Sequence, residues 1–259
     1  MKRIEFVWSL ALSAGLLWSA GCASEPAKPA PQPAARHEEP KPPAAAATEE
    51  TKITLPPGAA KAPAPFEGDG WQAMFDGHSL AGWHETAFAG HGDVHCQDGV
   101  IVLGMGNPFT GVNWTNDFPK MNYEVAFDAM RVMGSDFFCG LTVPVGDSFC
   151  SLIVGGWGGS LVGISSLDGM DASENETTKF VSFETGRWYR IRLRVTEKKL
   201  QAWIDQEKLV DVDTSEKKIA LRPGDIEMSK PLGVAAWQTA SALREIKFRK
   251  VSGPAGKGE

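Results

Sequence analysis

The sequence has few cysteines and no block of basic residues, and both absences exclude classes of protein. Its 259 residues contain four cysteines, and after Cys22 only Cys96, Cys139 and Cys150 remain. Three cysteines do not make a disulfide framework, and their spacing fits no zinc site. Acidic residues outnumber basic ones by 32 to 26, for a net charge of −6, so nucleic acid is not an expected partner.

A long apolar run is also missing. The run Phe6–Trp18 is shorter than the roughly 20 residues that a membrane-spanning helix needs. It follows a positively charged start and precedes small residues that end in Cys22. This order resembles a bacterial lipoprotein signal, so residues 1–22 are predicted to be a signal peptide with lipid on Cys22. Ordinary cleavage near Ala23, which would give a secreted protein, is the alternative.

Residues 23–65 have the composition of a linker. Eleven of the 17 prolines lie there, together with the alanine run Ala44–Ala47. Such a segment buries too little apolar surface to offset its ordering entropy, so we predict a disordered, extended tether. It would hold the working domain clear of the membrane. Residues 66–251 then form one domain, and residues 252–259 a flexible tail.

Helical periodicity is absent from this domain over any stretch of 12 residues. Several segments instead alternate apolar with polar residues, or are rich in β-branched and aromatic residues, with Gly, Asp, Pro or Lys clusters between them. Regularly spaced strands without helices predict an all-β sandwich or jelly roll. The predicted strands are 121–132, 136–143, 148–157, 160–167, 187–195, 200–213 and 243–251.

Two of the predicted hairpins have consequences for chemistry. In the first, Pro144 suits the second position of a turn, which sets Cys139 opposite Cys150. A cross-strand disulfide follows in an oxidising compartment, and a pair of buried free thiols is the alternative. In the second, a turn at Glu197-Lys198 sets one face of alternating apolar residues toward the core.

The opposite face of the second hairpin carries polar and aromatic side chains. Arg192 lies opposite Trp203 in this register, and Arg190 lies opposite Asp205. An exposed indole flanked by charged groups suits a sugar, because the ring covers the pyranose C–H face and the charges bind hydroxyls. The alternative is a solvated face on which Arg192 stacks on Trp203 and Arg190 pairs with Asp205.

Two blocks resemble a known family. "MFDGHSLAGW" (74–83) followed by "HCQDGVIVLG" (95–104), a Trp188-Tyr189 strand and the hairpin "LQAWIDQEKLVDV" (200–212) are similar to the 3-keto-disaccharide hydrolases, also described as 3-keto-glycoside lyases and hydratases. The resemblance implies a concanavalin A-like jelly-roll sandwich and a carbohydrate substrate. The family's polar pocket motifs are replaced here by Phe138-Cys139 and by Ser148–Leu152, so the resemblance assigns no catalytic carboxylate.

Candidate site residues come from two further segments. "GGWGG" (155–159) surrounds Trp157 with flexible backbone, which favours contact with a ligand. The loop "LDGMDASENE" (167–176) offers Asp168, Asp171 and Glu174, besides Glu176, as a general base or as calcium ligands, unless it is a solvated acidic surface. Either role would require a carboxylate of this loop to face the Arg192–Trp203 sheet.

One pattern suggests a metal. His91, Asp93 and His95 alternate, so on a strand all three would point to one side and could hold a divalent metal ion. The glycines before them indicate a loop instead.

The sequence as a whole predicts a lipid-anchored carbohydrate-active protein of the bacterial cell envelope. The preferred function is cleavage of a 3-keto-glycoside or a related sugar. A non-catalytic sugar-binding or adhesion module is the competing class. A structural envelope lipoprotein would leave the Trp and Arg face unexplained.

Overall fold

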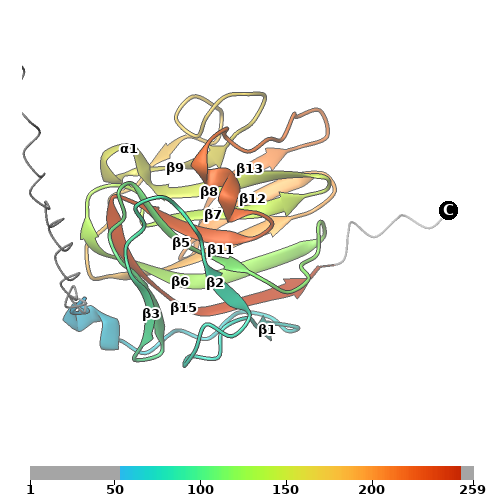
Figure 1. Cartoon of the computed structure of the whole chain (residues 1–259). Coiled ribbons are helices and arrows are strands. Elements are labelled where there is room, and N and C mark those ends of the chain that lie inside the picture. The colour runs from blue at the N-terminus through green and yellow to red at the C-terminus, as the bar shows by residue number, and fades with distance from the viewer. Residues whose placement is uncertain (1–52, 252–259) are drawn as a thin grey trace, which may run out of the picture. The chain divides into compact units, whose positions relative to one another are not determined.

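Alternating side chains build two antiparallel sheets that stack into a sandwich (Figure 1). The computed structural model describes residues 53–251. The predicted signal peptide with Cys22, most of the predicted tether and the tail 252–259 lie outside the described residues. No helix in the described range is long and apolar enough to cross a membrane.

The first sheet, called sheet A, has eight strands. Strand β1 (Gln72–Ala73) pairs with β15 beside the main path. In spatial order the path is β13 (Glu207–Asp213), β12 (Lys199–Ile204), β11 (Trp188–Val195), β6 (Tyr123–Gly134), β15 (Thr239–Lys250), β4 (Val100–Leu103) and β3 (Val94–Gln97).

The second sheet, sheet B, has seven strands. Its order is β10 (Lys179–Phe180), β9 (Leu161–Ser165), β8 (Ser148–Gly155), β7 (Cys139–Val145), β14 (Gly233–Trp237), β5 (Phe109–Trp114) and β2 (Trp83–Glu85). Helical turns are short: η1 (Pro57–Ala60), α1 (Gly156–Gly159) and η2 (Asp225–Ser229). The predicted all-β sandwich is confirmed.

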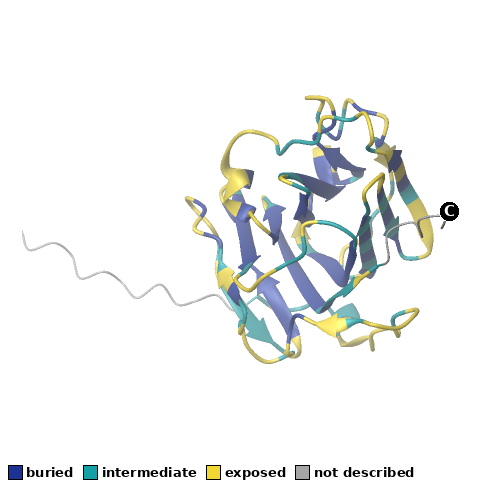
Figure 2. Cartoon of the chain, turned by 90° about the vertical axis from the view of Figure 1, so that its right-hand side faces the viewer, coloured by how far each residue is buried: buried dark blue, intermediate teal, exposed yellow. Residues whose placement is uncertain are grey.

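The core fills the space between the two sheets. Inward side chains of β6 and β11 from sheet A meet those of β7, β8 and β9 from sheet B in one large apolar cluster. Figure 2 shows the buried strands running through the molecule, with exposed residues concentrated in the loops. The predicted core face of β11 and β12 is part of this cluster: Tyr189, Ile191, Leu193, Val195, Leu200, Ala202 and Ile204.

The register of the second predicted hairpin is confirmed. Arg192 pairs with Trp203, and Val195 pairs with Leu200. The single strand predicted over 200–213 is wrong, because a second turn at Asp205-Gln206 divides it into β12 and β13. Asp205 has a positive φ of 54° at this turn, a conformation that Asp tolerates better than most side chains.

The predicted pairing of Cys139 with Cys150 is wrong. The chain turns at Gly146-Asp147, so Val143 lies opposite Cys150, and Cys139 lies opposite Val154. Gly146 has a φ of +62°, the conformation that two-residue hairpin turns require and that Pro144 cannot adopt. Both thiols are free and buried, and burial raises the pKa of Cys150 to about 12.

Residues 53–71, here called the strap, cover the outer face of sheet A. In Figure 1 the strap runs below β15. Ile53, Leu55 and Ala59 pack against an apolar cluster that includes Trp188 and Met130. The indole nitrogen of Trp188 donates to the Ala59 carbonyl at 3.2 Å. Residues 53–65 therefore belong to the folded domain, and this part of the predicted tether is corrected.

Candidate functional site

The signature block at 74–83 has a structural role. One carboxylate oxygen of Asp76 accepts hydrogen bonds from the backbone N–H groups of His78 and Ser79 at 2.7 and 2.8 Å, and the other from the Ser79 hydroxyl at 2.7 Å. These bonds lower the pKa of Asp76 to about 2, and the bond from the Ser79 hydroxyl has the largest effect. The buried Trp83 donates from its indole nitrogen to the Met74 carbonyl at 2.7 Å. The block closes a turn against the core.

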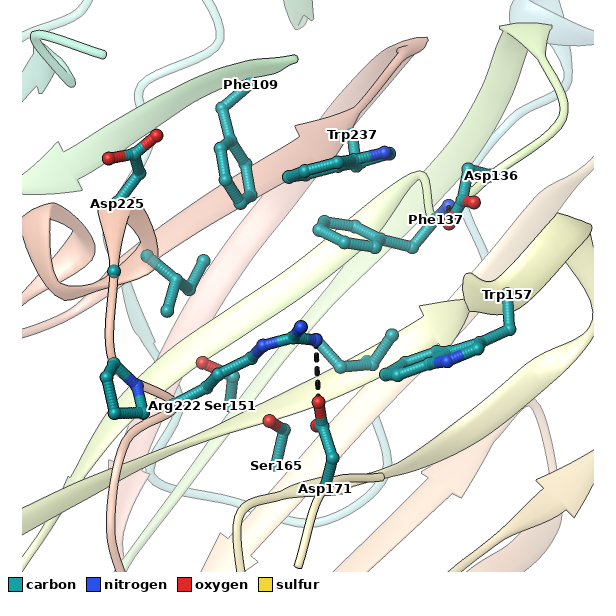
Figure 3. A pocket seen from close by; sticks show the side chains of 14 residues that line it. Phe109, Asp136, Phe137, Ser151, Trp157, Ser165, Asp171, Arg222, Asp225 and Trp237 are labelled. Atoms are coloured by element: carbon teal, nitrogen blue, oxygen red, sulfur yellow. Dashed lines mark hydrogen bonds and ion pairs between the residues drawn. The ribbon is translucent and has the colours of Figure 1, made fainter. Parts of the chain in front are cut away.

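A cavity of about 470 Å³ opens on the outer face of sheet B (Figure 3). Its lining comes from β5, β8, β9 and β14 and from four loops that are far apart in sequence. The lining residues are Phe109, Asp136, Phe137, Ser151, Ile153, Trp157, Ser165, Asp171, Arg222, Pro223, Gly224, Asp225, Ile226 and Trp237.

One wall of the cavity is aromatic. Phe109 on β5 meets Trp237 at the end of β14 with ring centroids 4.6 Å apart and planes at 89°. Phe137, from the loop before β7, lies 6.1 Å from Phe109 and 6.4 Å from Trp237. Figure 3 shows Trp157 across the cavity from this group. Such ring faces match the C–H faces of a sugar ring.

The Trp157 loop depends on glycine. Trp157 is 45% exposed and has φ 49° and ψ 55°, with φ also positive at Gly155, Gly158 and Gly159. Residues that carry a side chain rarely adopt the left-handed backbone conformation several times in succession, so the glycines allow this turn. The loop therefore projects the Trp157 indole from the end of β8 into the cavity. The predicted strand 148–157 is two residues too long, because β8 ends at Gly155.

A buried arginine holds this loop in place. Arg131 on β6 is 6% exposed, and its Nη2 donates to the carbonyls of Gly159, Asp136 and Gly155 at 2.8, 3.2 and 3.4 Å. No carboxylate in the described range forms an ion pair with it. Burial lowers the pKa of Arg131, and Tyr189 and Asp136 oppose that shift. Its bonds join the two segments that carry Trp157 and Asp136.

The facing wall is polar. Asp171 accepts from Arg222 Nη1 at 2.6 Å and from the backbone N–H of Ala172 at 2.8 Å. The Ser151 hydroxyl is paired with Thr142 at 2.8 Å, whereas that of Ser165 has no hydrogen-bond partner among residues 53–251. The cavity thus combines an apolar platform with an acid–base pair and hydroxyl groups.

Only one carboxylate of the predicted acidic loop reaches the cavity. Asp171 does, but Asp168 pairs with Lys217 at 3.2 Å and accepts from the backbone N–H of Lys218 at 2.8 Å. Glu174 is exposed, and Glu176 pairs with Lys217 at 3.1 Å. The loop does not face the Arg192–Trp203 sheet, as the hypothesis required, because it follows β9 and Asp171 opens onto sheet B.

The predicted sugar face on sheet A is largely engaged in protein contacts. Arg192 stacks on Trp203 with its guanidinium carbon 4.0 Å from the ring centroid. Arg190 pairs with the buried Asp128, and Asp205 pairs with Arg187 at 2.8 Å. The predicted alternative, in which Arg192 stacks on Trp203, therefore holds. The expected pair of Arg190 with Asp205 is replaced by the pair of Arg190 with Asp128.

The strap completes this covered face. Arg190 donates to the Ala64 carbonyl at 2.8 Å and stacks on Phe66 at 3.9 Å. A cavity of about 150 Å³ remains between strap and sheet, with Arg190, Arg192 and Asp205 in its lining. Trp157 lines the cavity of the other sheet, so the structure does not bring the predicted substrate-binding residues together.

The predicted metal ligands do not converge. His91 pairs with Glu85 at 2.7 Å, whereas His95 contacts Asp93. Within residues 53–251 no three His, Cys, Asp or Glu side chains are placed to hold a metal ion. Loop backbone before β3, which begins only at Val94, turns His91 away from the other two.

A family model for the 3-keto-alpha-glucoside-1,2-lyase-like domain matches residues 70–252. The chain belongs to this family. The resemblance carried by its sequence motifs is confirmed, and with it the assignment to a carbohydrate-active or carbohydrate-binding class. The sequence blocks that carry the resemblance form the turn at 74–83 and the β12–β13 hairpin of this structure. No curated protein matches the chain in sequence.

Several solved structures are similar to this chain at low identity. A protein presumed to be a glycosyl hydrolase from Parabacteroides distasonis is 15% identical, with a TM-score of 0.46 over 71% of this chain and 95% of its own. Carbohydrate-binding module CBM66 from Bacillus subtilis is 8% identical, with a TM-score of 0.43 over 69% and 100%. A Bacillus subtilis protein of unknown function with a galectin-like fold is 9% identical, with a TM-score of 0.47 over 68% and 92%. Likenesses this weak carry no information on ligand or activity.

Most of the cavity was not predicted from sequence. Trp157 and Asp171 were among the candidates, but Asp136, Arg222, Asp225 and Trp237 were not. Arg222 and Trp237 lie far along the chain from the segment 155–171. The bridge between Leu167 and Ile219 brings Arg222 to this segment, and the pairing of β7 with β14 brings Trp237. The one local signal was a large aromatic at the end of a strand, as in "GVAAW" (233–237).

Proposed function

We propose that the protein binds a carbohydrate in the cavity of sheet B and cleaves a 3-keto-glycoside or a related sugar there. The observation that carries this proposal is the Asp171–Arg222 ion pair, which opens into a cavity with an aromatic wall. A sugar ring lying on Trp157 or Trp237 would bring its carbon and hydroxyl substituents to that pair.

The chemistry requires a base and a cation. A ketone acidifies the C–H bond beside it, so a carboxylate can take that proton while a guanidinium stabilises the negative charge on the ketone oxygen. The bond from the next carbon to the glycosidic oxygen then breaks, a double bond forms in the ring, and the protonated carboxyl returns its proton to the leaving oxygen. Asp171 would be the base and Arg222 the cation. Asp171 is mostly buried and Arg222 largely exposed, so the guanidinium can turn toward a ligand.

Turnover of a synthetic 3-keto-disaccharide, followed by mass spectrometry, tests this function. Asp171→Asn should lower kcat by at least about a hundredfold and change the Kd little, because general-base catalysis contributes about 10²- to 10⁴-fold. Asp168→Asn is the matched control, since it removes the same charge from the same loop outside the cavity. Equal activity of wild type and Asp171→Asn would reject Asp171 as the base.

A non-catalytic sugar-binding module is the second candidate. It is favoured by the fact that both oxygens of Asp171 already accept hydrogen bonds. Saturable binding of a glycoside without any product from a 3-keto-disaccharide would select this candidate. Absence of binding to glycans and 3-keto-glycosides alike would reject both functions.

We also propose that the protein is exported and lipid-anchored through Cys22 to the bacterial cell envelope. The charged start, the apolar run 6–18 and the small residues before Cys22 support this. Metabolic labelling with a fatty-acid analogue should mark the wild type and not Cys22→Ala. A soluble, unlabelled product that begins at Ala23 would reject the anchor and indicate secretion.

A further inference from the structure

The charges that line the cavity of sheet B are mostly negative. Asp136, Asp171 and Asp225 face it, against Arg222, and the described lining contains neither lysine nor histidine. Arg222 is paired with Asp171, so its charge is already compensated. The formal excess of negative charge therefore resides on Asp136 and Asp225. Figure 3 shows these two carboxylates on opposite sides of the aromatic group.

These two carboxylates are held differently. Asp136 accepts hydrogen bonds from the backbone N–H groups of Phe137 and Gly158, at 2.7 and 3.3 Å. Asp225 is exposed at the start of η2, and no residue in the described range donates to its carboxylate. Neither forms an ion pair among residues 53–251. The charge of Asp136 is partly compensated by the nearby Arg131 guanidinium, whereas the charge of Asp225 is fully available to a ligand.

A hydroxyl group also faces the cavity. Ser165, at the end of β9, lines it, and its hydroxyl forms no hydrogen bond with a described residue. The Ser165 oxygen is not among the fully buried unpaired polar atoms of residues 53–251, so it is open to the cavity and can bond a ligand or water there. It adds an acceptor to the same cavity as the carboxylates.

The aromatic wall has the same electrostatic preference as the carboxylates. The faces of Trp157 and Trp237 carry the negative part of the ring quadrupole, which attracts a cation. An ammonium group donates three hydrogen bonds and accepts none. The Asp225 carboxylate and the Ser165 hydroxyl can accept them, and the Asp136 oxygens, which each accept one backbone N–H, keep further lone pairs. An anionic sugar would find only a guanidinium that already has a partner.

We propose that the ligand of this cavity is an amino sugar, a glycoside whose free amine is protonated at neutral pH. This inference rests on the proposed function, because it names the substrate class of the same site. The sugar ring lies on the aromatic wall, and its ammonium group lies near Asp225 or Asp136. The Asp171–Arg222 pair remains free to act on the ring.

Three disaccharides with one linkage provide the test. The β-1,4-linked dimers of glucosamine, N-acetylglucosamine and glucose differ only in an ammonium, an acetamide or a hydroxyl group on the ring. Calorimetric titration at low salt should give the glucosamine dimer an affinity about tenfold higher than that of the glucose dimer. The preference should shrink in 1 M salt, and above the pKa of the amine.

Variants locate the preference. Asp225→Asn should reduce it about three- to fivefold, and its exposed position makes loss of folding unexpected. Asp136→Asn should act in the same direction. Asp98→Asn is the matched control, because it removes one exposed carboxylate at the β3–β4 turn of the other sheet. An equal effect of Asp225→Asn and Asp98→Asn would trace the preference to the overall charge and overturn the inference.

The outcomes separate this inference from the proposed function. If the glucose dimer or a neutral 3-keto-glycoside binds as tightly as the glucosamine dimer, the amino-sugar inference fails and the proposed function stands. If no saccharide binds, neutral or cationic, both fail. Tighter binding of the glucosamine dimer that survives in Asp225→Asn and Asp136→Asn together would place the ammonium elsewhere and overturn the site.

Discussion

The outer faces of the two sheets contain similar residues and use them in opposite ways. On sheet A, Glu124 is fully buried and pairs with Arg194 at 2.9 Å and Arg249 at 2.5 Å, with Arg192 at 3.6 Å. Arginine and aromatic side chains stack there beneath the strap. On sheet B, aromatic and acidic side chains line an open cavity. The difference shows that charge and aromaticity mark an outer face, whereas the covering segment decides whether a ligand can reach it.

The largest effect is expected on the covered face. Glu124→Gln should lower the free energy of unfolding by about 2–3 kcal/mol, because it leaves three partly buried guanidinium groups without a compensating charge. Urea denaturation measures this change. Asp147→Asn, at a nearly fully exposed carboxylate, should leave the unfolding midpoint almost unchanged. A loss below about 1 kcal/mol for Glu124→Gln would mean that the strap and the stacked rings stabilise the arginines without it.

The exposed Trp157 and the half-buried Trp203 should separate binding from stability. Trp157→Ala should weaken sugar binding about tenfold, which corresponds to a lost stacking contact of roughly 1.4 kcal/mol. Trp203→Ala should leave the Kd unchanged and lower the Tm, because Trp203 stacks on Arg192 and Arg194. Calorimetric titration of both variants measures the Kd, and thermal denaturation measures the Tm. The reverse result would move the binding site to sheet A.

A smaller effect on affinity is expected from the arginine that positions the Trp157 loop. Arg131→Lys keeps the positive charge but loses the planar guanidinium group that donates to several carbonyls at once. The Trp157 loop should then be held less firmly, and we expect about three- to fivefold weaker sugar binding. In a Trp157→Ala background the same change should have almost no further effect, since its action is through the indole. Additive effects in the double variant would show that Arg131 acts on the fold alone.

The smallest effect concerns the strap. Phe66 stacks on Arg190 at 3.9 Å and lies 4.5 Å from the Lys247 ammonium. Phe66→Ala should destabilise the protein by about 1 kcal/mol and leave sugar affinity unchanged, because the strap covers the sheet that does not bind. A change in Kd would show that the two faces are coupled through the core.

Local patterns were sufficient for much of the sandwich. Alternation along 187–195 placed Tyr189 and Ile191 in the core and Arg190 outside, and the turn at Glu197-Lys198 set the pairing of Arg192 with Trp203. These features depend on neighbours in sequence, so a strand period of two and a short turn are enough to predict them. The register of the first hairpin was missed because Gly146, not Pro144, has the backbone freedom that the turn needs.

The sequence by itself determined the all-β class, the family, the core face of β11 and β12 and the candidacy of Trp157 and Asp171. Only the tertiary structure decided which outer face is open. Pairing of β7 with β14 brings Trp237 beside Phe137, and the loop after β9 meets Arg222 from another part of the chain. The strap, whose composition resembles a linker, is ordered by the arginines and the apolar cluster that it covers. Such contacts join residues distant in sequence, and no local periodicity encodes them.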